Sequence, residues 1–66
     1  MKPSQEEIKA KAKSLHEEQK QIYPFCSIEP DVVEDYVRNN WNRAEQLSAD
    51  WLFDYAVSQN LCEVEE

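Results

Sequence analysis

The chain contains no glycine among its 66 residues, although average usage of about 7% would supply several. Phosphate-binding loops and dinucleotide-binding fingerprints need glycine so that the backbone can approach the ligand, and both are therefore excluded. Two-residue hairpin turns also favour glycine, so antiparallel sheet is disfavoured. Asparagine is then the residue type best suited to a left-handed conformation.

Metal ligands and long apolar runs are also scarce. A zinc site uses about four nitrogen or sulfur ligands, whereas the chain has one histidine, His16, and two cysteines, Cys26 and Cys62. We therefore expect no metal and no cofactor. The cysteines are expected to be free thiols, with a single bridge as the alternative, because the sequence does not fix the distance between their Cα atoms.

The longest apolar run spans three residues, 51–53, whereas a membrane-spanning helix needs roughly 20. No segment has the pattern of a signal peptide. Combined with reduced thiols, these features favour a cytoplasmic location.

Basic residues are half as frequent as acidic ones. Seven Lys and Arg residues stand against fourteen Asp and Glu residues, for a net charge of −7. The five lysines all lie in residues 1–22, and residues 23–66 hold ten acids and two arginines. Neutralising phosphates takes clustered Lys and Arg, so direct nucleic-acid binding is not expected. The acidic part instead favours a partner protein with a basic surface.

Helical periodicity predicts an all-α fold, a three-helix bundle or orthogonal array without sheet. The three helices are expected at about residues 4–22, 30–40 and 43–60. They form one small domain over residues 1–66, whose acidic tail at about 61–66 is expected to fray.

The helix boundaries rest on recognisable end signals. Ser4 and Glu7 have the spacing of a capping box. Pro24 ends the first helix, because the residue before proline avoids helical geometry. Pro30 suits the first position of the second helix, and Asn42 is a favourable N-cap for the third.

The third segment shows the most regular apolar spacing. Its predicted core stripe, centred on Trp51 and Tyr55, follows the i, i+3, i+4 pattern of a packed helix. The members of this stripe are Ala44, Leu47, Ser48, Trp51, Leu52, Tyr55 and Ala56.

A rotation of 100° per residue then places Phe53 opposite that stripe. Ala49 and Val57 lie on the same side, with Asp50 and Asp54 beside them. An apolar strip with an acidic margin is typical of an interaction site. The strip would contact either a foreign protein or a second copy of the chain. The alternative is that the first helix or the tail covers this side.

Catalysis is not expected. The many carboxylates fall on predicted solvent faces or in the tail, whereas acid–base work needs a pocket that shifts a pKa. No nucleophile is paired with the single histidine, His16, at a helical spacing.

Residues 23–53 also resemble the UBA/CUE group of ubiquitin-binding three-helix domains. The similar elements, in order, are Tyr23-Pro24, Glu29 to Asp35, the turn Asn39 to Asn42, and Ala49 to Phe53. The resemblance implies that Tyr23, Pro24, Leu52 and Phe53 would contact ubiquitin. The family's Met-Phe-Pro or Met-Gly-Phe element is not present, and the connector is one or two residues longer.

These observations predict an acidic protein-binding factor (an adaptor, inhibitor or accessory subunit) that acts by surface contact without catalysis. In size and charge it is similar to many phage and mobile-element regulators. One alternative is a ubiquitin-binding module, and another is an acidic mimic of nucleic acid that blocks a DNA- or RNA-binding protein. Mimicry predicts salt-dependent binding that survives Phe53→Ala, whereas an apolar anchor predicts the reverse.

Overall fold

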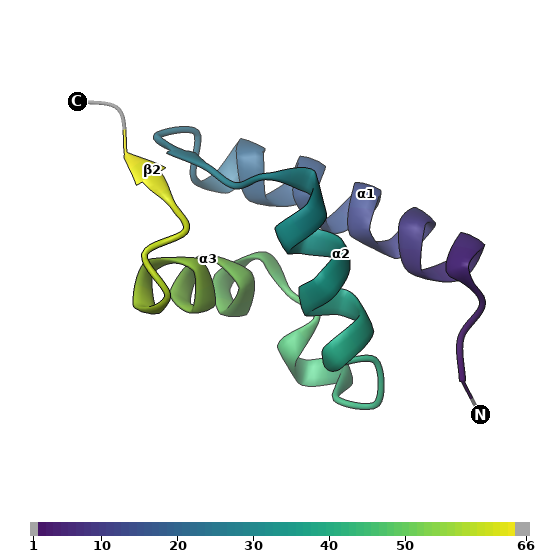
Figure 1. The fold of residues 1–66 in the computed structure, drawn as a ribbon. Coiled ribbons are helices and arrows are strands. Elements are labelled where there is room, and N and C mark those ends of the chain that lie inside the picture. Colours follow the sequence, from purple (N-terminus) through teal and green to yellow (C-terminus); the bar gives the residue numbers. More distant parts are fainter. Residues whose placement is uncertain (1, 65–66) are drawn as a thin grey trace.

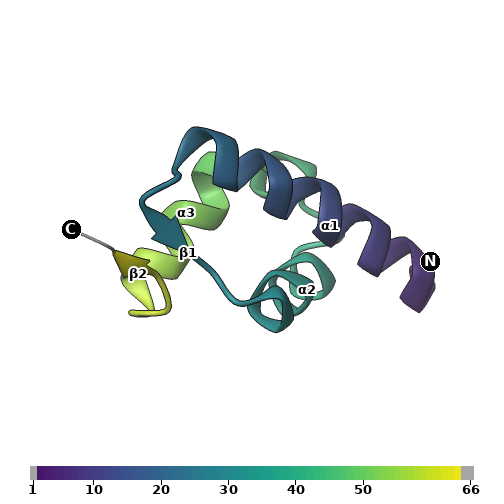
Figure 2. The same ribbon diagram turned by 90° about the horizontal axis from the view of Figure 1, so that it is seen from above.

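A computed structural model describes residues 2–64 of the chain and confirms the all-α, three-helix fold. Helix α1 spans Gln5–Ile22, α2 spans Pro30–Asn39 and α3 spans Ala49–Ser58. Helix α1 packs against both α2 and α3, which lie on the same side of it (Figure 2). Helices α2 and α3 run in different directions beneath α1 (Figure 1). None of the described helices combines the length and the apolar character that a bilayer-spanning segment requires.

The predicted signals at the start of α1 and α2 are confirmed. The Glu7 backbone N–H donates to Ser4 Oγ at 3.1 Å, and the Ser4 N–H donates to Glu7 Oε1 at 3.2 Å. These two bonds form the complete capping box, which satisfies two donors that the first turn leaves free. Pro30 is the first residue of α2, as expected.

The third helix is shorter than predicted. Instead of one helix over 43–60, the chain forms a 3₁₀ turn, η1, at Ala44–Gln46 before α3 begins. Asn42 is therefore not the N-cap. Ser48 has that role, since its Oγ accepts a hydrogen bond from the Trp51 backbone N–H at 3.4 Å. This break in the helix at Ser48 changes which side of α3 is buried.

The core lies where α1 crosses the other two helices. Its fully buried members include Leu15 of α1, Val33 and Val37 of α2, and Leu52 of α3. Gln19 is also fully buried, and its Nε2 donates to the carbonyl oxygen of Cys26 at 3.0 Å. This polar residue of α1 thus holds the following connector against the core.

The chain turns sharply after α3. Asn60 has a φ of 58° and is the single described non-glycine residue with a positive φ. The N–H groups of Asn60 and Leu61 donate to the carbonyls of Val57 and Ala56, at 3.1 and 2.8 Å. This is the Schellman arrangement that ends many helices, with asparagine in place of glycine. It directs the chain back toward the connector between α1 and α2.

The segment after α3 is joined to the connector between α1 and α2. The expectation of free thiols and the expectation of a frayed tail are therefore both wrong. Cys62 forms a disulfide with Cys26, and no cysteine is a free thiol. Strand β1, Cys26–Ser27, pairs antiparallel with β2, Glu63–Val64. The tail is therefore tied down as far as residue 64, and residues 65–66 lie outside the described part. These short strands are the only extended pairing among residues 2–64, so the all-α class stands.

Candidate functional site

The buried side of α3 differs from the predicted one. Ala49, Leu52 and Ala56 are 2%, 0% and 0% exposed, and Phe53 packs half-buried beside them. These four residues follow the i, i+3, i+4, i+7 pattern of a packed helix. Trp51, expected at the centre of the core, is 49% exposed.

The error has a local cause. The predicted stripe took its phase from Ala44 and Leu47, but the α-helical turn does not continue through Ser48. Apolar spacing before that break therefore carries no information about the face of α3. The small side chains of Ala49 and Ala56 face the core, where they allow close approach of neighbouring elements.

The predicted apolar strip does not form on the surface. Ala49 is buried, and the Phe53 ring stacks on the Tyr23 ring with 4.1 Å between centroids and an interplanar angle of 4°. Phe25 meets Phe53 edge-on at 5.9 Å. Among the apolar residues of the predicted strip, Val57 is the one that remains on the surface, with 52% of its area exposed.

The aromatic contact is reinforced by a polar one. The Tyr23 hydroxyl donates a 2.5 Å hydrogen bond to Asp50 Oδ1. This bond to a carboxylate, with a smaller desolvation contribution, raises the pKa of Tyr23 above its ordinary value. The connector is thus held against α3 by a ring stack and a hydrogen bond, about one helical turn apart on α3.

A first hollow, of about 310 Å³, opens beside this contact. Its lining consists of Tyr23, Asp50, Trp51, Phe53 and Asp54. Three rings and two carboxylates therefore surround one small volume on the outer side of α3.

A second hollow, of about 260 Å³, lies on the other side of Trp51. Its lining consists of Tyr36, Asn40, Gln46, Trp51, Asp54 and Tyr55. The Tyr36 and Tyr55 rings are 4.9 Å apart, and the Tyr36 hydroxyl donates to the Gln46 carbonyl at 2.6 Å. Burial, then the neighbouring Tyr55 and Asp54, raise the pKa of Tyr36. Trp51 and Asp54 border both hollows.

The two hollows have the same electrostatic character. Among the described residues, no lysine or arginine lines either of them, whereas carboxylates and aromatic faces do. Aromatic faces are negative and attract cations. We call this surface, formed by Asp50, Trp51, Asp54 and Tyr55, the outer face of α3.

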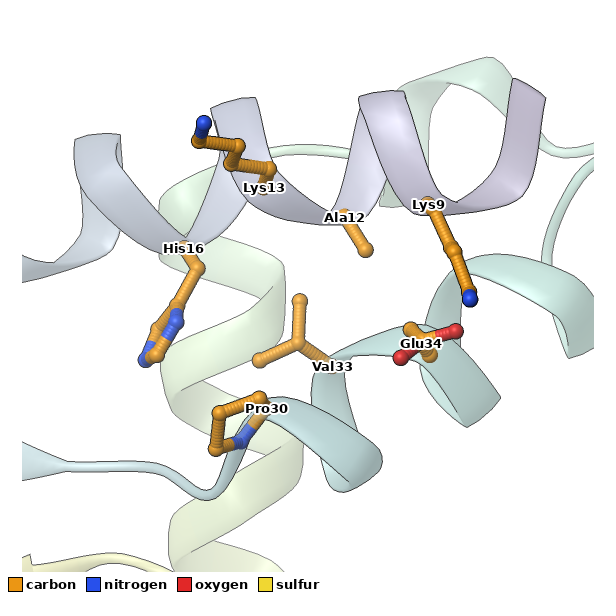
Figure 3. Close-up of a pocket in the computed structure, with 7 residues that line it drawn as sticks. All are labelled: Lys9, Ala12, Lys13, His16, Pro30, Val33 and Glu34. Carbon is orange, nitrogen blue, oxygen red and sulfur yellow. The ribbon is translucent and has the colours of Figure 1, made fainter. Parts of the chain in front are cut away.

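A different hollow, of about 260 Å³, lies in the seam between α1 and α2 (Figure 3). His16 extends toward Pro30, Lys9 extends toward Glu34, and Lys13 points away from the cavity. Burial, followed by the charge of nearby Lys20, lowers the pKa of His16 below 6.5. The residues of this seam hold α1 against the start of α2.

His16 gives the fold a pH dependence of defined sign. Because its pKa is lower in the folded state, the unfolded chain binds more protons between the folded pKa and 6.5. The stability that neutral His16 contributes is therefore complete above pH 6.5 and is lost as the pH falls through the folded pKa. When urea unfolding is measured at pH 7.5 and at pH 5.5, the free energy of unfolding should fall less between the two pH values for His16→Gln than for the wild-type chain. Equal losses would contradict this assignment.

The residues implied by the ubiquitin-binding resemblance are only partly brought together. Tyr23 and Phe53 are in direct contact, and Pro24 is exposed beside them. Leu52, however, is fully buried. Three of the four side chains thus lie at the junction of connector and α3, and two of them are half-buried against each other.

Apolar spacing in the sequence did not identify Trp51 and Tyr55 as surface residues. The local signal is Ser48, an N-cap followed by acidic Asp50 in the first turn, which marks where α3 begins. It does not choose between the stripe at positions 49, 52, 53 and 56 and the stripe that contains Trp51, because both fit the same helix.

No protein-family model matches the chain, and no curated protein or solved structure shows a significant similarity to it.

Proposed function

We propose that this protein is a non-catalytic binding factor that docks on a basic surface of another protein through the outer face of α3. The observation that carries the proposal is Trp51, an indole 49% exposed on the helix side opposite the core. Large aromatic side chains of this kind are enriched among residues that dominate binding energy. The surface strip predicted around Phe53 does not form, because Ala49 is buried and Phe53 stacks on Tyr23, and this surface takes its place.

The charge of the chain supports a basic partner. Asp50 and Asp54 flank Trp51 on α3 and are exposed, and the chain as a whole carries a net charge of −7. Complementary charge steers association and speeds encounter. The acidic groups would orient a partner, and the indole would supply the apolar contact.

The location of the protein also needs revision. The cytoplasmic assignment relied partly on reduced thiols, and the Cys26–Cys62 bridge removes that premise. Disulfides persist mainly in oxidising compartments. We propose that the bridged chain acts in such a compartment.

The proposal is tested by affinity capture from the source cells with three immobilised proteins: wild type, Trp51→Ala and Val57→Ala. Val57 is as exposed as Trp51 but lines neither hollow. We expect wild type and Val57→Ala to retain the same basic protein, and Trp51→Ala to lose it. Circular dichroism of the three proteins confirms that each is folded.

The outcome separates this function from the others. A partner retained by Trp51→Ala at low salt but released by moderate salt would indicate nucleic-acid mimicry instead. If Val57→Ala loses the partner protein and Trp51→Ala retains it, the partner contacts another side of α3.

The contact between Tyr23 and Phe53 favours ubiquitin as a second candidate partner, because it brings together two of the residues that the UBA/CUE resemblance assigns to ubiquitin contact. Titration with free ubiquitin tests this candidate. Binding that is weakened by Pro24→Ala and unaffected by Trp51→Ala would support it.

A further inference from the structure

We infer that the partner inserts two cationic side chains into the outer face of α3, one on each side of the Trp51 indole. The inference rests on the proposed function and specifies the chemistry that the face recognises. Its basis is that the two hollows share Trp51 and Asp54 but are otherwise lined by different residues. The structure therefore offers two adjacent sites, separated by one ring.

The first hollow is suited to a Lys or Arg side chain. Asp50 uses Oδ1 to accept the Tyr23 hydroxyl, which leaves its other oxygen free to accept from a cation. Asp54 supplies a second carboxylate to the same hollow. The stacked Tyr23 and Phe53 rings support the aliphatic part of the incoming side chain, and Trp51 offers a ring face for cation–π contact.

The second hollow is better suited to arginine. It has one carboxylate, from Asp54, together with the amide side chains of Asn40 and Gln46. A guanidinium has five donors in a planar fork and stacks on aromatic faces, so it can use several acceptors at once. The Tyr36 and Tyr55 rings, 4.9 Å apart, provide such faces beside Trp51.

The carboxylates of the two hollows argue against an apolar occupant. The hollows measure about 310 and 260 Å³, and an apolar side chain there would desolvate Asp50 or Asp54 without supplying a partner. Burying an unpaired charge is costly. A cationic group instead neutralises the carboxylate that it meets.

The experiment uses the two tryptophans of the chain. Trp41→Phe leaves Trp51 as the only indole, so its fluorescence reports on the outer face alone. The probes are capped peptides with two arginines separated by zero to four alanines, and a one-arginine peptide of equal length. At low salt we expect the best-spaced two-arginine peptide to bind at least about tenfold more tightly than the one-arginine control, because the second contact is intramolecular.

Two carboxylate variants assign the sites. Asp50→Asn should bring the affinity for the two-arginine peptide close to the affinity for the one-arginine peptide, because the first hollow loses one of its two carboxylates whereas the second hollow keeps its only one. Asp54→Asn should weaken both peptides. Glu18→Gln, which changes the net charge equally but lies on α1 outside both hollows, should leave the ratio of affinities unchanged.

The inference and the proposed function fail in different ways. Equal affinity of the one- and two-arginine peptides at every spacing, with a response of Trp51 fluorescence to both, would overturn the paired sites and leave a single docking point. Equal effects of Asp50→Asn and Glu18→Gln would also overturn the pairing. If neither peptide changes the fluorescence of Trp51, the inference is overturned and the proposed basic partner loses its support.

Discussion

Replacing Cys62 with serine is expected to lower the free energy of unfolding by about 4 kcal/mol under oxidising conditions. The bridge joins residues 36 apart in sequence, and closing a loop of this length restricts the unfolded chain by roughly that amount in the chain-entropy account. Cys62 is the suitable position, because it is partly exposed whereas Cys26 is buried at 1% exposure. Urea unfolding monitored by circular dichroism measures the loss.

The reduced wild-type chain provides the matching control. Adding a dithiol reductant should bring wild type to the stability of Cys62→Ser and should leave the variant unchanged. Intact mass after alkylation, without prior reduction, reports the thiol state of the same samples. If reductant does not alter the free energy of unfolding of wild type, the disulfide does not stabilise the fold by the expected amount.

The second large effect distinguishes two neighbouring residues of α3. Leu52→Ala should destabilise the fold by roughly 2–5 kcal/mol, because Leu52 is fully buried and its removal leaves a cavity. Trp51→Ala removes a larger side chain but should cost less than about 1 kcal/mol, since surface substitutions rarely cost more. Urea unfolding of both variants at one pH makes the comparison.

A loss of this size is comparable to the whole stability of a small domain, so loss of helical circular dichroism of Leu52→Ala at zero urea also counts as the expected result. The opposite ranking, with Trp51→Ala the more damaging change, would show that α3 packs by the stripe predicted from the sequence. The outer face, and both proposals built on it, would then be wrong.

The first two helices could be predicted from the sequence because their ends are marked by local chemistry. Ser4 and Glu7 satisfy each other's backbone donors, and Pro30 is compatible only with the start of a helix at that place. The buried residues of α1 also follow helical spacing, and Gln19 at the end of that row is fixed by its hydrogen bond to the Cys26 carbonyl, a contact that the spacing does not contain.

The face of α3 could not be fixed in the same way, because two stripes compete for it. One contains Trp51 and Tyr55, the other contains Ala49 and Phe53, and positions 52 and 56 belong to both. Burying the stripe with Trp51 and Tyr55 would remove more apolar area from water. The break at Ser48 and the stacking of Phe53 on Tyr23 nevertheless select the stripe that contains Phe53. Stacking with a residue 30 positions earlier is a tertiary effect that periodicity does not contain.

The disulfide was beyond prediction for a related reason. Its two sulfur atoms meet only after Asn60 turns the chain and β2 pairs with β1. The absence of glycine pointed to asparagine as the residue type for a left-handed turn, and Asn60 adopts that conformation with a φ of 58°. The sequence did not show which asparagine would do so, and Asn40 ends α2 with a φ of −117°.

The central claim is that Trp51 is exposed on an acidic face, and collisional quenching tests it most directly. In the Trp41→Phe protein, the fluorescence of Trp51 should be quenched readily. With each quencher normalised to its effect on free N-acetyltryptophanamide, quenching should be stronger by caesium than by iodide, because Asp50 and Asp54 attract the cation and repel the anion. Added sodium chloride should narrow the difference between the two quenchers. Emission that resists both quenchers would place the indole inside the protein and contradict the account.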